Sequence, residues 1–183
     1  MVLVANDFDY VRSTVRQVPN FPKEGILFLD ITTAVKDAKS MEKMIDFLYD
    51  QFKDEKIDYV AGIESRGFIF GAPLACKLGA GFVPIRKPNK LPADTIKESY
   101  SLEYGTDTIE MHTDAVKSGD RVVVIDDLLA TGGTAAAACN LVRKAGADVV
   151  AAAFIIELDP LKGREKIEEK GVNVISMLHY DLD

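Results

Sequence analysis

The sequence predicts an open α/β fold with a mostly parallel central sheet. Short runs of β-branched and aliphatic residues, such as Val122–Ile125 and Val149–Ile156, alternate with longer segments whose apolar residues recur at helical spacing, such as Met41–Lys53. Continuous apolar runs are typical of strands that are buried on both faces of a parallel sheet. Because strands and helices alternate, right-handed crossovers should keep the strands parallel. The 183 residues suffice for one sizeable core, so we expect a single domain over residues 1–183.

The first part of the chain is expected to hold two helices and one irregular segment. A helix is predicted over Asp7–Arg16, where apolar residues share one helical face. Prolines and a glycine then interrupt regular structure, so the apolar segment Phe21–Ile31 is expected to be a loop that packs on the core. The next helix is predicted over Met41–Lys53, with Ser40 as its N-cap.

The middle of the chain should supply two strands around one helix. Ile57–Ile63 and Phe82–Ile85 are predicted strands. Between them, Phe68–Leu78 is predicted to be an amphipathic helix that ends at Gly79. The stretch Arg86–Ser99 is then expected to be a long loop, and loops of that length in compact domains are usually functional.

Two antiparallel strands and two further helix–strand units complete the predicted fold. Tyr100–Thr113 has the pattern of two antiparallel strands with a bend between them. A helix over Thr134–Ala145 should follow the strand at Val122. Asp159 and Pro160 fit the N-cap and the first position of a last helix, before a last strand at residues 172–177.

A small-residue loop after the strand at Val122 suits a phosphate. Asp126 and Asp127 stand at the predicted end of that strand, and the loop Ala130–Thr134 opens into an alanine-rich helix. Such a loop can turn several backbone N–H groups toward an anion, and the helix dipole adds roughly 0.3–1 kcal/mol. A Walker A loop would have Lys where Gly133 stands, and the dinucleotide fingerprint is absent. Because carboxylates accept hydrogen bonds from vicinal hydroxyls, the pattern indicates a ribose with a terminal phosphate.

A second polar loop, Glu64–Gly67, precedes a predicted helix in the same way. A cation is unfavourable at a helix N-terminus, so Arg66 suggests an anionic partner nearby. Both polar loops follow strands of the predicted parallel sheet. Open α/β folds bind their ligands at the carboxyl ends of such strands, so we expect ligand groups at both loops.

Composition and charge argue against several functional classes. The formal net charge of −7 argues against a nucleic-acid surface, and no apolar run approaches the ~18 residues of a membrane span. Cys76 and Cys139 lie in apolar, helix-like segments without a nearby cysteine, so both are predicted to be reduced core thiols. The two histidines lack the spacing of zinc ligands. We therefore expect a cytosolic protein without nucleic-acid or membrane partners.

The segment IDDLLATGGT resembles the motif that binds phosphoribosyl pyrophosphate (PRPP) in type I phosphoribosyltransferases. The similarity to the adenine phosphoribosyltransferases of that family covers nearly the whole chain. It rests on six segments in the family's order: FPKEGILF with DIT, GIESRGFIFG, IRKPNKLP, SYSLEYG, VVVIDDLLATGGT and ELDPLKGREK. The resemblance implies the type I fold, in which helices flank the central sheet. It also implies a base-binding hood segment within residues 1–35 and a flexible lid loop and hairpin at residues 86–112.

The reaction that this resemblance implies is purine salvage by transfer at C1′ of the ribose. Adenine and PRPP would give AMP and pyrophosphate. Positive charge develops at C1′ as pyrophosphate leaves, so the enzyme must bind the leaving group and keep water out. Mg²⁺ is the implied cofactor, held mainly by PRPP and water rather than by protein ligands. The implied assembly is a homodimer.

The resemblance further implies a role for each site residue. Glu103 would be catalytic, through proton transfer at the purine, and Tyr104 would help to close the lid. The implied contacts are Leu27, Phe28 and Leu128 for the base; Ser65, Arg66, Lys87 and Lys90 for pyrophosphate; Asp126 and Asp127 for the ribose; and Ala130, Thr131, Gly132, Gly133 and Thr134 for the 5′-phosphate. Arg86 would act across the dimer. Family members often hold a cis peptide at the position of Glu64–Ser65.

The base pocket is where the chain departs from the family pattern. Leu29 stands where the family usually has Arg, and Thr33-Ala34-Val35 replaces the common Thr-Pro-Leu. The loss of a donor beside the base bears on adenine affinity and selectivity, whereas the PRPP site is untouched. Two alternatives stay open: a phosphoribosyltransferase for hypoxanthine, guanine or xanthine, and a non-catalytic regulator that senses PRPP.

Overall fold

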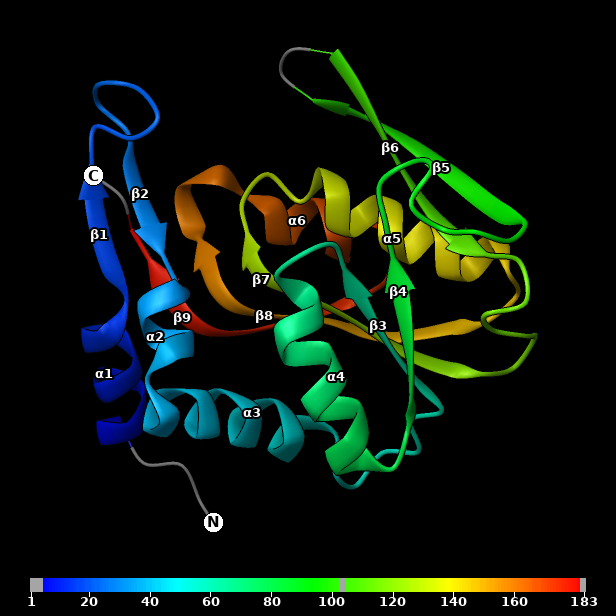
Figure 1. The fold of residues 1–183 in the computed structure, drawn as a ribbon, viewed down its shortest axis with the longest axis horizontal. Coiled ribbons are helices and arrows are strands. Elements are labelled where there is room, and N and C mark those ends of the chain that lie inside the picture. The colour runs from blue at the N-terminus through cyan, green and yellow to red at the C-terminus, as the bar shows by residue number, and fades with distance from the viewer. Residues whose placement is uncertain (1–4, 103–104, 182–183) are drawn as a thin grey trace.

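A parallel sheet of five strands forms the centre of the computed structural model, which describes residues 5–102 and 105–181 (Figure 1). The strand order is β4-β3-β7-β8-β9, and every neighbouring pair is parallel. The strands are β3 (Tyr59–Ile63), β4 (Gly81–Ile85), β7 (Arg121–Leu129), β8 (Asp148–Leu158) and β9 (Asn173–Tyr180). The predicted α/β fold with a parallel sheet is therefore confirmed.

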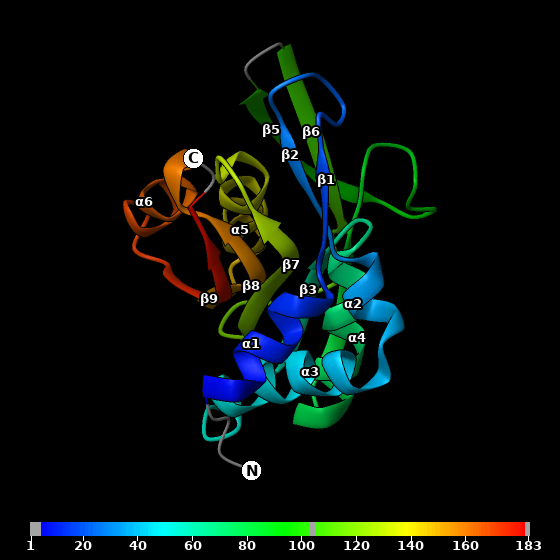
Figure 2. The same cartoon turned by 90° about the vertical axis from the view of Figure 1, so that its left-hand side faces the viewer.

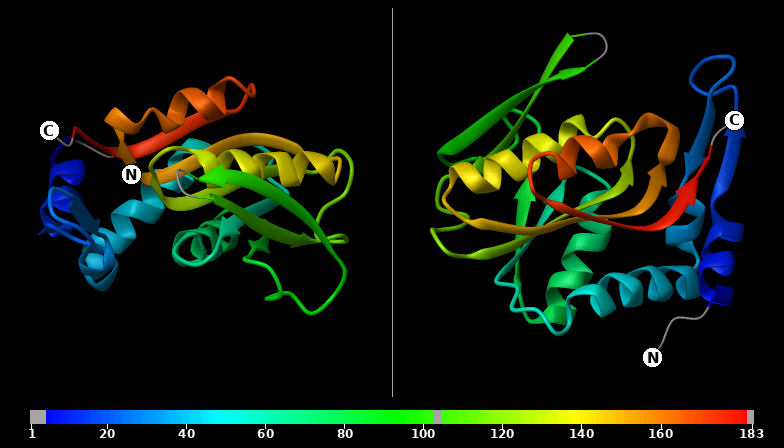
Figure 3. Two further views of the ribbon diagram at one scale, coloured as in Figure 1. Left: turned by 90° about the horizontal axis from the view of Figure 1, so that it is seen from above. Right: turned by 180° about the vertical axis from the view of Figure 1, so that it is seen from behind.

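Helices cover both faces of this sheet (Figures 2 and 3). Side chains alternate along β7, so Val123 and Ile125 enter one core cluster while Val122 and Val124 enter the other. The first cluster packs under α1, α3 and α4, and the second packs under α5 and α6. The bounds are α1 (Ala5–Thr14), α2 (Thr32–Lys36), α3 (Ala38–Phe52), α4 (Gly67–Leu78), α5 (Gly133–Lys144) and α6 (Gly163–Glu168).

Two antiparallel hairpins stand outside the central sheet. β1 (Arg16–Pro19) pairs with β2 (Leu27–Asp30), and β5 (Thr95–Leu102) pairs with β6 (Gly105–His112). Figure 1 shows them rising at opposite sides of the molecule, above the ends of the sheet strands. The second hairpin packs on α5, and an isolated bridge between Arg86 and Glu110 links its base to the end of β4.

The N-terminal segment differs from its prediction. The first helix ends at Thr14, and Arg16 already belongs to β1. The expected loop at residues 21–31 contains β2. Leu29 and Ile31 pack in the core as expected, whereas Phe21 is 50% exposed. Strands of four residues are too short to show a clear alternation, and Pro19 is tolerated because β1 is an edge strand.

Several other helices and strands begin or end at residues that differ from the predicted ones. Asp37, rather than Ser40, caps α3, because its carboxylate accepts a hydrogen bond of 2.8 Å from the Ser40 N–H. The loop after β4 ends before β5 begins at Thr95, and β7 continues past the two acids to Leu129. The segment at Asp159–Leu161 is a separate 3₁₀ turn (η1), and α6 begins only at Gly163.

The predicted end of α4 is confirmed, whereas one cysteine prediction is wrong. Gly79 closes the helix with a left-handed φ of 68°, a conformation that favours glycine. Cys139 is buried, but Cys76 is exposed on α4. Among the described residues, the helices are all too short or too polar to cross a membrane.

Asp30 ties the first hairpin to α2. Its carboxylate accepts hydrogen bonds from the Thr32 hydroxyl (2.6 Å), the Thr32 N–H (2.9 Å) and Arg16 Nε (3.0 Å). The bonds from Thr32 and then from Arg16 lower the pKa of Asp30 to about 2. The ionised carboxylate therefore holds the strand that leads from the hairpin into the core.

We expect Asp30→Asn to lower the urea midpoint of unfolding at neutral pH. Because the folded pKa of about 2 lies below the unfolded value of ~3.9, this stabilisation is complete above pH ~4 and is lost as pH falls toward 2. Urea titrations of the wild type and the variant between pH 7 and pH ~2.5 should show the gap in midpoint closing. Asp114→Asn, at an exposed turn, is the control. A gap that stays constant with pH would contradict the linkage.

Candidate active site

The loops after β3 and β7 lie side by side at the carboxyl edge of the sheet. The two strands pair in parallel from Tyr59 with Val122 to Gly62 with Ile125. A Cβ on Gly67 would lie 2.5 Å from the Ile125 carbonyl oxygen and 3.3 Å from Asp126 Cα. Glycine at position 67 therefore lets the start of α4 approach the end of β7 at backbone distance. This contact brings the two predicted ligand loops together.

An ion pair joins these loops. Arg66 Nε donates a hydrogen bond to the carboxylate of Asp127, whose side chain is 7% exposed while that of Arg66 is 47% exposed. Because the bond uses Nε, the terminal guanidinium nitrogens stay available to another acceptor. Burial would lower the pKa of Arg66, but the charges of Asp127, Asp126 and Asp30 raise it. Asp127 is thus an anionic neighbour of Arg66, while the pyrophosphate contact that the resemblance implies stays a prediction.

The second acid of the pair has a different environment. Burial, and then the charge of Asp127, raise the pKa of Asp126 well above its ordinary value. Its Oδ1 accepts a hydrogen bond of 2.9 Å from the Asp127 N–H. A carboxylate so placed gains from hydroxyl donors or a cation beside it. The pair therefore fits a ligand that offers hydroxyl groups.

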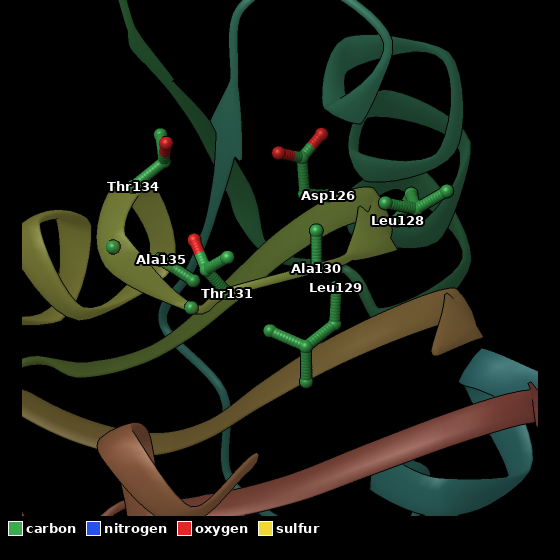
Figure 4. A pocket seen from close by; sticks show the side chains of 9 residues that line it. Asp126, Leu128, Leu129, Ala130, Thr131, Thr134 and Ala135 are labelled. Carbon is green, nitrogen blue, oxygen red and sulfur yellow. The ribbon is translucent and has the colours of Figure 1, made fainter. Parts of the chain in front are cut away.

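The loop after β7 surrounds a small cavity of about 90 Å³ (Figure 4). Figure 4 shows the carboxylate of Asp126 and the hydroxyls of Thr131 and Thr134 around this hollow, while Leu129 points away into the core. The volume is well below the ~300–1,000 Å³ of a whole small-molecule pocket, so the loop suits one group of a larger ligand. Gly132 has a left-handed φ of 74° directly before α5 begins. The helix N-terminus thus faces the hollow, as a phosphate requires.

A segment distant in sequence supports this loop from behind. A Cβ on Gly163 would lie 2.1 Å from the Ala130 carbonyl oxygen and 2.8 Å from the Gly132 nitrogen. Arg164 anchors the segment, because its guanidinium donates to Glu157 at 2.6 and 3.0 Å and to the Val174 carbonyl oxygen at 2.7 Å. Sequence reasoning noted the segment ELDPLKGREK but missed this contact, which no local pattern encodes.

Three basic side chains follow β4, one strand beyond β3. Arg86 donates to Glu64 at 3.1 and 3.3 Å within its own chain. Burial opposes ionisation of Glu64, but Arg86 and the Lys87 N–H keep its pKa lowered. The Lys87 ammonium pairs with Asp107 of β6, and Lys90 is exposed. Ser65, which is exposed, follows Glu64 through a cis peptide bond, as the resemblance implied. These groups border the Arg66 loop.

The β1–β2 hairpin carries a larger cavity of about 530 Å³. Phe28 lines it, and its ring meets Phe21 edge to face with centroids 5.1 Å apart. Leu29 points the other way, since successive strand residues alternate, and it is 5% exposed within the core. Leu27 and Leu128 are half-buried. The side chain of Leu29 therefore does not border the Phe28 cavity, and its effect on affinity for the base stays a prediction.

Glu103, the predicted catalytic residue, and Tyr104, which was predicted to help close the lid, lie outside the described residues. Glu103 and Tyr104 connect β5 to β6, whose pairing reaches Leu102 and Gly105 on either side. The roles of both residues remain predictions.

His179 is isolated in the sequence, but it has two acidic neighbours in the structure. Its Nδ1 lies 2.8 Å from Asp159 and 3.9 Å from Glu157. Arg164 already holds Glu157 through two hydrogen bonds, so a cation would compete with an existing ion pair. This group is a structural network at the ends of β8 and β9.

Comparison with known proteins identifies the relatives of this chain. Residues 31–181 match the phosphoribosyl transferase domain. The chain is 56% identical to adenine phosphoribosyltransferase of Solibacter usitatus over 93% of its own length and 98% of that protein.

Two solved structures of relatives hold ligands. Adenine phosphoribosyltransferase from Saccharomyces cerevisiae, complexed with an imino-altritol bisphosphate and adenine, aligns with a TM-score of 0.89 and 42% identity over 96% of this chain and 100% of that one. The enzyme from Trypanosoma brucei, in complex with AMP, pyrophosphate and ribose 5-phosphate, aligns with a TM-score of 0.87 and 28% identity over 94% and 79%.

The contact behind the loop can be tested with Gly163→Ala. The added methyl group has no space against Ala130 and Gly132, so the loop must shift. We expect the dissociation constant for ribose 5-phosphate, measured by calorimetry, to rise about tenfold or more. Glu165→Ala, at an exposed position of the same helix, is the control and should bind as the wild type does. Unchanged binding in Gly163→Ala would contradict the supporting role.

Proposed function

The chain belongs to the adenine phosphoribosyltransferase family, and we propose that it transfers the phosphoribosyl group of PRPP to N9 of adenine, giving AMP and pyrophosphate. The observation that carries this proposal is the Arg66–Asp127 ion pair, which joins an acidic, phosphate-accepting loop to a basic loop. PRPP has the matching order of groups, because its ribose lies between a 5′-phosphate and a pyrophosphate at C1′.

The loop after β7 would hold the ribose 5-phosphate half of PRPP. We propose that the backbone of residues 130–134 and the hydroxyls of Thr131 and Thr134 bind the 5′-phosphate at the N-terminus of α5. Asp126 and Asp127 would accept hydrogen bonds from the ribose hydroxyls. The position of Asp126 supports this assignment, since its carboxylate lies at the edge of the cavity (Figure 4).

The basic groups would bind the leaving pyrophosphate. Arg66 can offer its terminal nitrogens while Asp127 keeps hold of Nε, and Ser65 adds a hydroxyl beside it. Lys87 and Lys90 supply further positive charge. Because C1′ becomes cationic as pyrophosphate departs, donors fixed on the leaving oxygens lower the barrier. In the proposed homodimer, Arg86 would contact the ligand in the partner's site. Within its own chain, Arg86 donates a hydrogen bond to Glu64.

Mg²⁺ would neutralise charge on the pyrophosphate when bound. PRPP and water would hold the ion, because Asp127 is already paired with Arg66 and Asp126 is assigned to the ribose. Asp126 and Asp127 would orient the ribose hydroxyls that face such a cation. We also propose a cytoplasmic location, which suits two cysteines that form no disulfide.

The hairpins would enclose the base and exclude water. Phe28 would stack on one face of the purine and Leu128 on the other, while backbone groups of Leu27 read its edge. We propose that the hood lies within residues 1–35 and the lid within residues 86–112 of a single domain. Glu103 would hold or move the purine proton, and Tyr104 would close against the ligand.

Adenine should be the preferred base. Pyrophosphate release from PRPP and magnesium, measured in parallel with adenine, hypoxanthine, guanine, xanthine, uracil and orotate, tests this directly. Leu29, which stands where the family usually has Arg, lies in the core and leaves the Phe28 cavity intact. We therefore expect kcat/KM for adenine to exceed kcat/KM for each other base at least about hundredfold. Comparable values for another purine would move the assignment to that base. No release with any base would favour a PRPP-sensing regulator.

Glu103→Gln should lower kcat by about 10²–10⁴ while the KM for PRPP changes little. A general acid or base contributes on that scale, and the amide keeps the size of the side chain without its proton chemistry. Steady-state kinetics with adenine and PRPP measures both constants. Asp94→Asn, at an exposed position before β5, controls for loss of charge near the hairpin. An unchanged kcat in Glu103→Gln would remove Glu103 from the mechanism.

A further inference from the structure

The hydroxyl of Tyr100 on β5 lies between the phosphate loop and Lys87. Thr134 Oγ1 donates to Tyr100 Oη at 3.1 Å, and Tyr100 Oη donates to Asp107 Oδ2 at 3.2 Å. The ammonium of Lys87 lies 3.4 Å from the same Oη and pairs with the same Asp107 carboxylate. One phenol therefore contacts a residue from each phosphate-binding side of the proposed site.

Independent contacts fix the position of this phenol. The ring of Tyr100 packs against the core cluster beneath α5. Two residues earlier, Glu98 accepts a hydrogen bond of 3.0 Å from Asn140 and pairs with Lys144, both on α5. These bonds clamp β5 along the helix that begins at the phosphate loop. The short distance from Tyr100 to Thr134 is thus imposed by several contacts rather than by one bond.

Thr134 lies in the first turn of α5, so no preceding turn of the helix offers its Oγ1 a backbone carbonyl. Without another partner, a Thr side chain divides between χ1 rotamers. The bond to Tyr100 selects one rotamer of Thr134, and this rotamer keeps the hydroxyl at the cavity that Figure 4 shows.

We propose that Tyr100 is a positioning residue for PRPP, which holds the Thr134 hydroxyl for the 5′-phosphate and the Lys87 ammonium for pyrophosphate. A phenol can both accept and donate a hydrogen bond. When Thr134 turns its proton to a phosphate oxygen, Tyr100 can donate to Thr134 Oγ1 and accept from Lys87. Only the bond between Thr134 and Tyr100 reverses; Tyr100 then gives up its bond to Asp107, which stays paired with Lys87. This inference rests on the proposed function.

Tyr100→Phe tests the proposal, because it removes the hydroxyl and keeps the ring. We expect the dissociation constant for ribose 5-phosphate and the KM for PRPP to rise about three- to tenfold, the scale of one hydrogen bond. The KM for adenine and the thermal midpoint should stay unchanged. Ser99→Ala is the matched control, since Ser99 bonds Thr108 across the same hairpin at 2.9 Å and points away from Tyr100.

A double-mutant cycle with Thr134→Val separates positioning from general packing. If Tyr100 acts through Thr134, the variant Tyr100→Phe/Thr134→Val should bind ribose 5-phosphate no more weakly than Thr134→Val alone. Additive losses, or wild-type binding in Tyr100→Phe, would overturn the proposal.

Calorimetry keeps the two claims apart, because it needs no turnover. A wild-type protein that binds ribose 5-phosphate but forms no AMP would contradict the proposed function while the cycle still tests Tyr100. A wild-type protein that binds no ribose 5-phosphate would overturn both.

Discussion

The ion pair between Arg66 and Asp127 is the interaction on which the site depends. Asp127 is almost fully buried, and a buried carboxylate without a partner is strongly destabilising. Arg66 provides that partner from a neighbouring loop, and glycine at position 67 lets the two loops meet at backbone distance. The bond uses Nε and so leaves the terminal nitrogens of Arg66 available to another acceptor. One contact between the loops after β3 and β7 therefore bears on both stability and the proposed ligand geometry.

The remaining parts of the site are held by contacts of long sequence separation. Gly163 backs the phosphate loop from beyond β8, and Tyr100 reaches the first turn of α5 from the second hairpin. Asp30 fixes the first hairpin to α2 next to Phe28. A rigid parallel sheet places all of these segments at one edge. The proposed chemistry needs this arrangement, since in-line transfer depends on placing both reactants to within a fraction of an ångström.

Local patterns in the sequence were sufficient to predict the sheet and the two polar loops at its carboxyl edge. Buried strands show continuous apolar runs, and Gly79 marks the end of a helix. The loop at residues 130–134 consists of small residues. The resemblance to a family supplied the roles of the loops. The first hairpin was missed because its strands are four residues long and prolines surround them. The cap of α3 was predicted at Ser40 rather than at Asp37, because both residue types suit that position.

Interactions between distant segments could not be predicted in this way. Neither the close approach of Gly163 to Ala130 nor the bond from Thr134 to Tyr100 leaves a periodic signal. Leu29 is buried because it lies on the inward face of β2, and this strand was not predicted. Only the structure therefore shows the parts of the site that depend on contacts between residues far apart in the sequence.

The most direct test of the central ion pair is the affinity for magnesium pyrophosphate, measured by calorimetry in Asp127→Asn and Asp126→Asn. If Asp127 orients Arg66, Asp127→Asn should weaken binding about tenfold, the scale of a hydrogen bond to a charged group. Asp126→Asn should change it less than about twofold, because the hydrogen bond that orients Arg66 runs to Asp127. Equal or tighter binding in Asp127→Asn would contradict this account, since it would show that Asp127 only repels the anion.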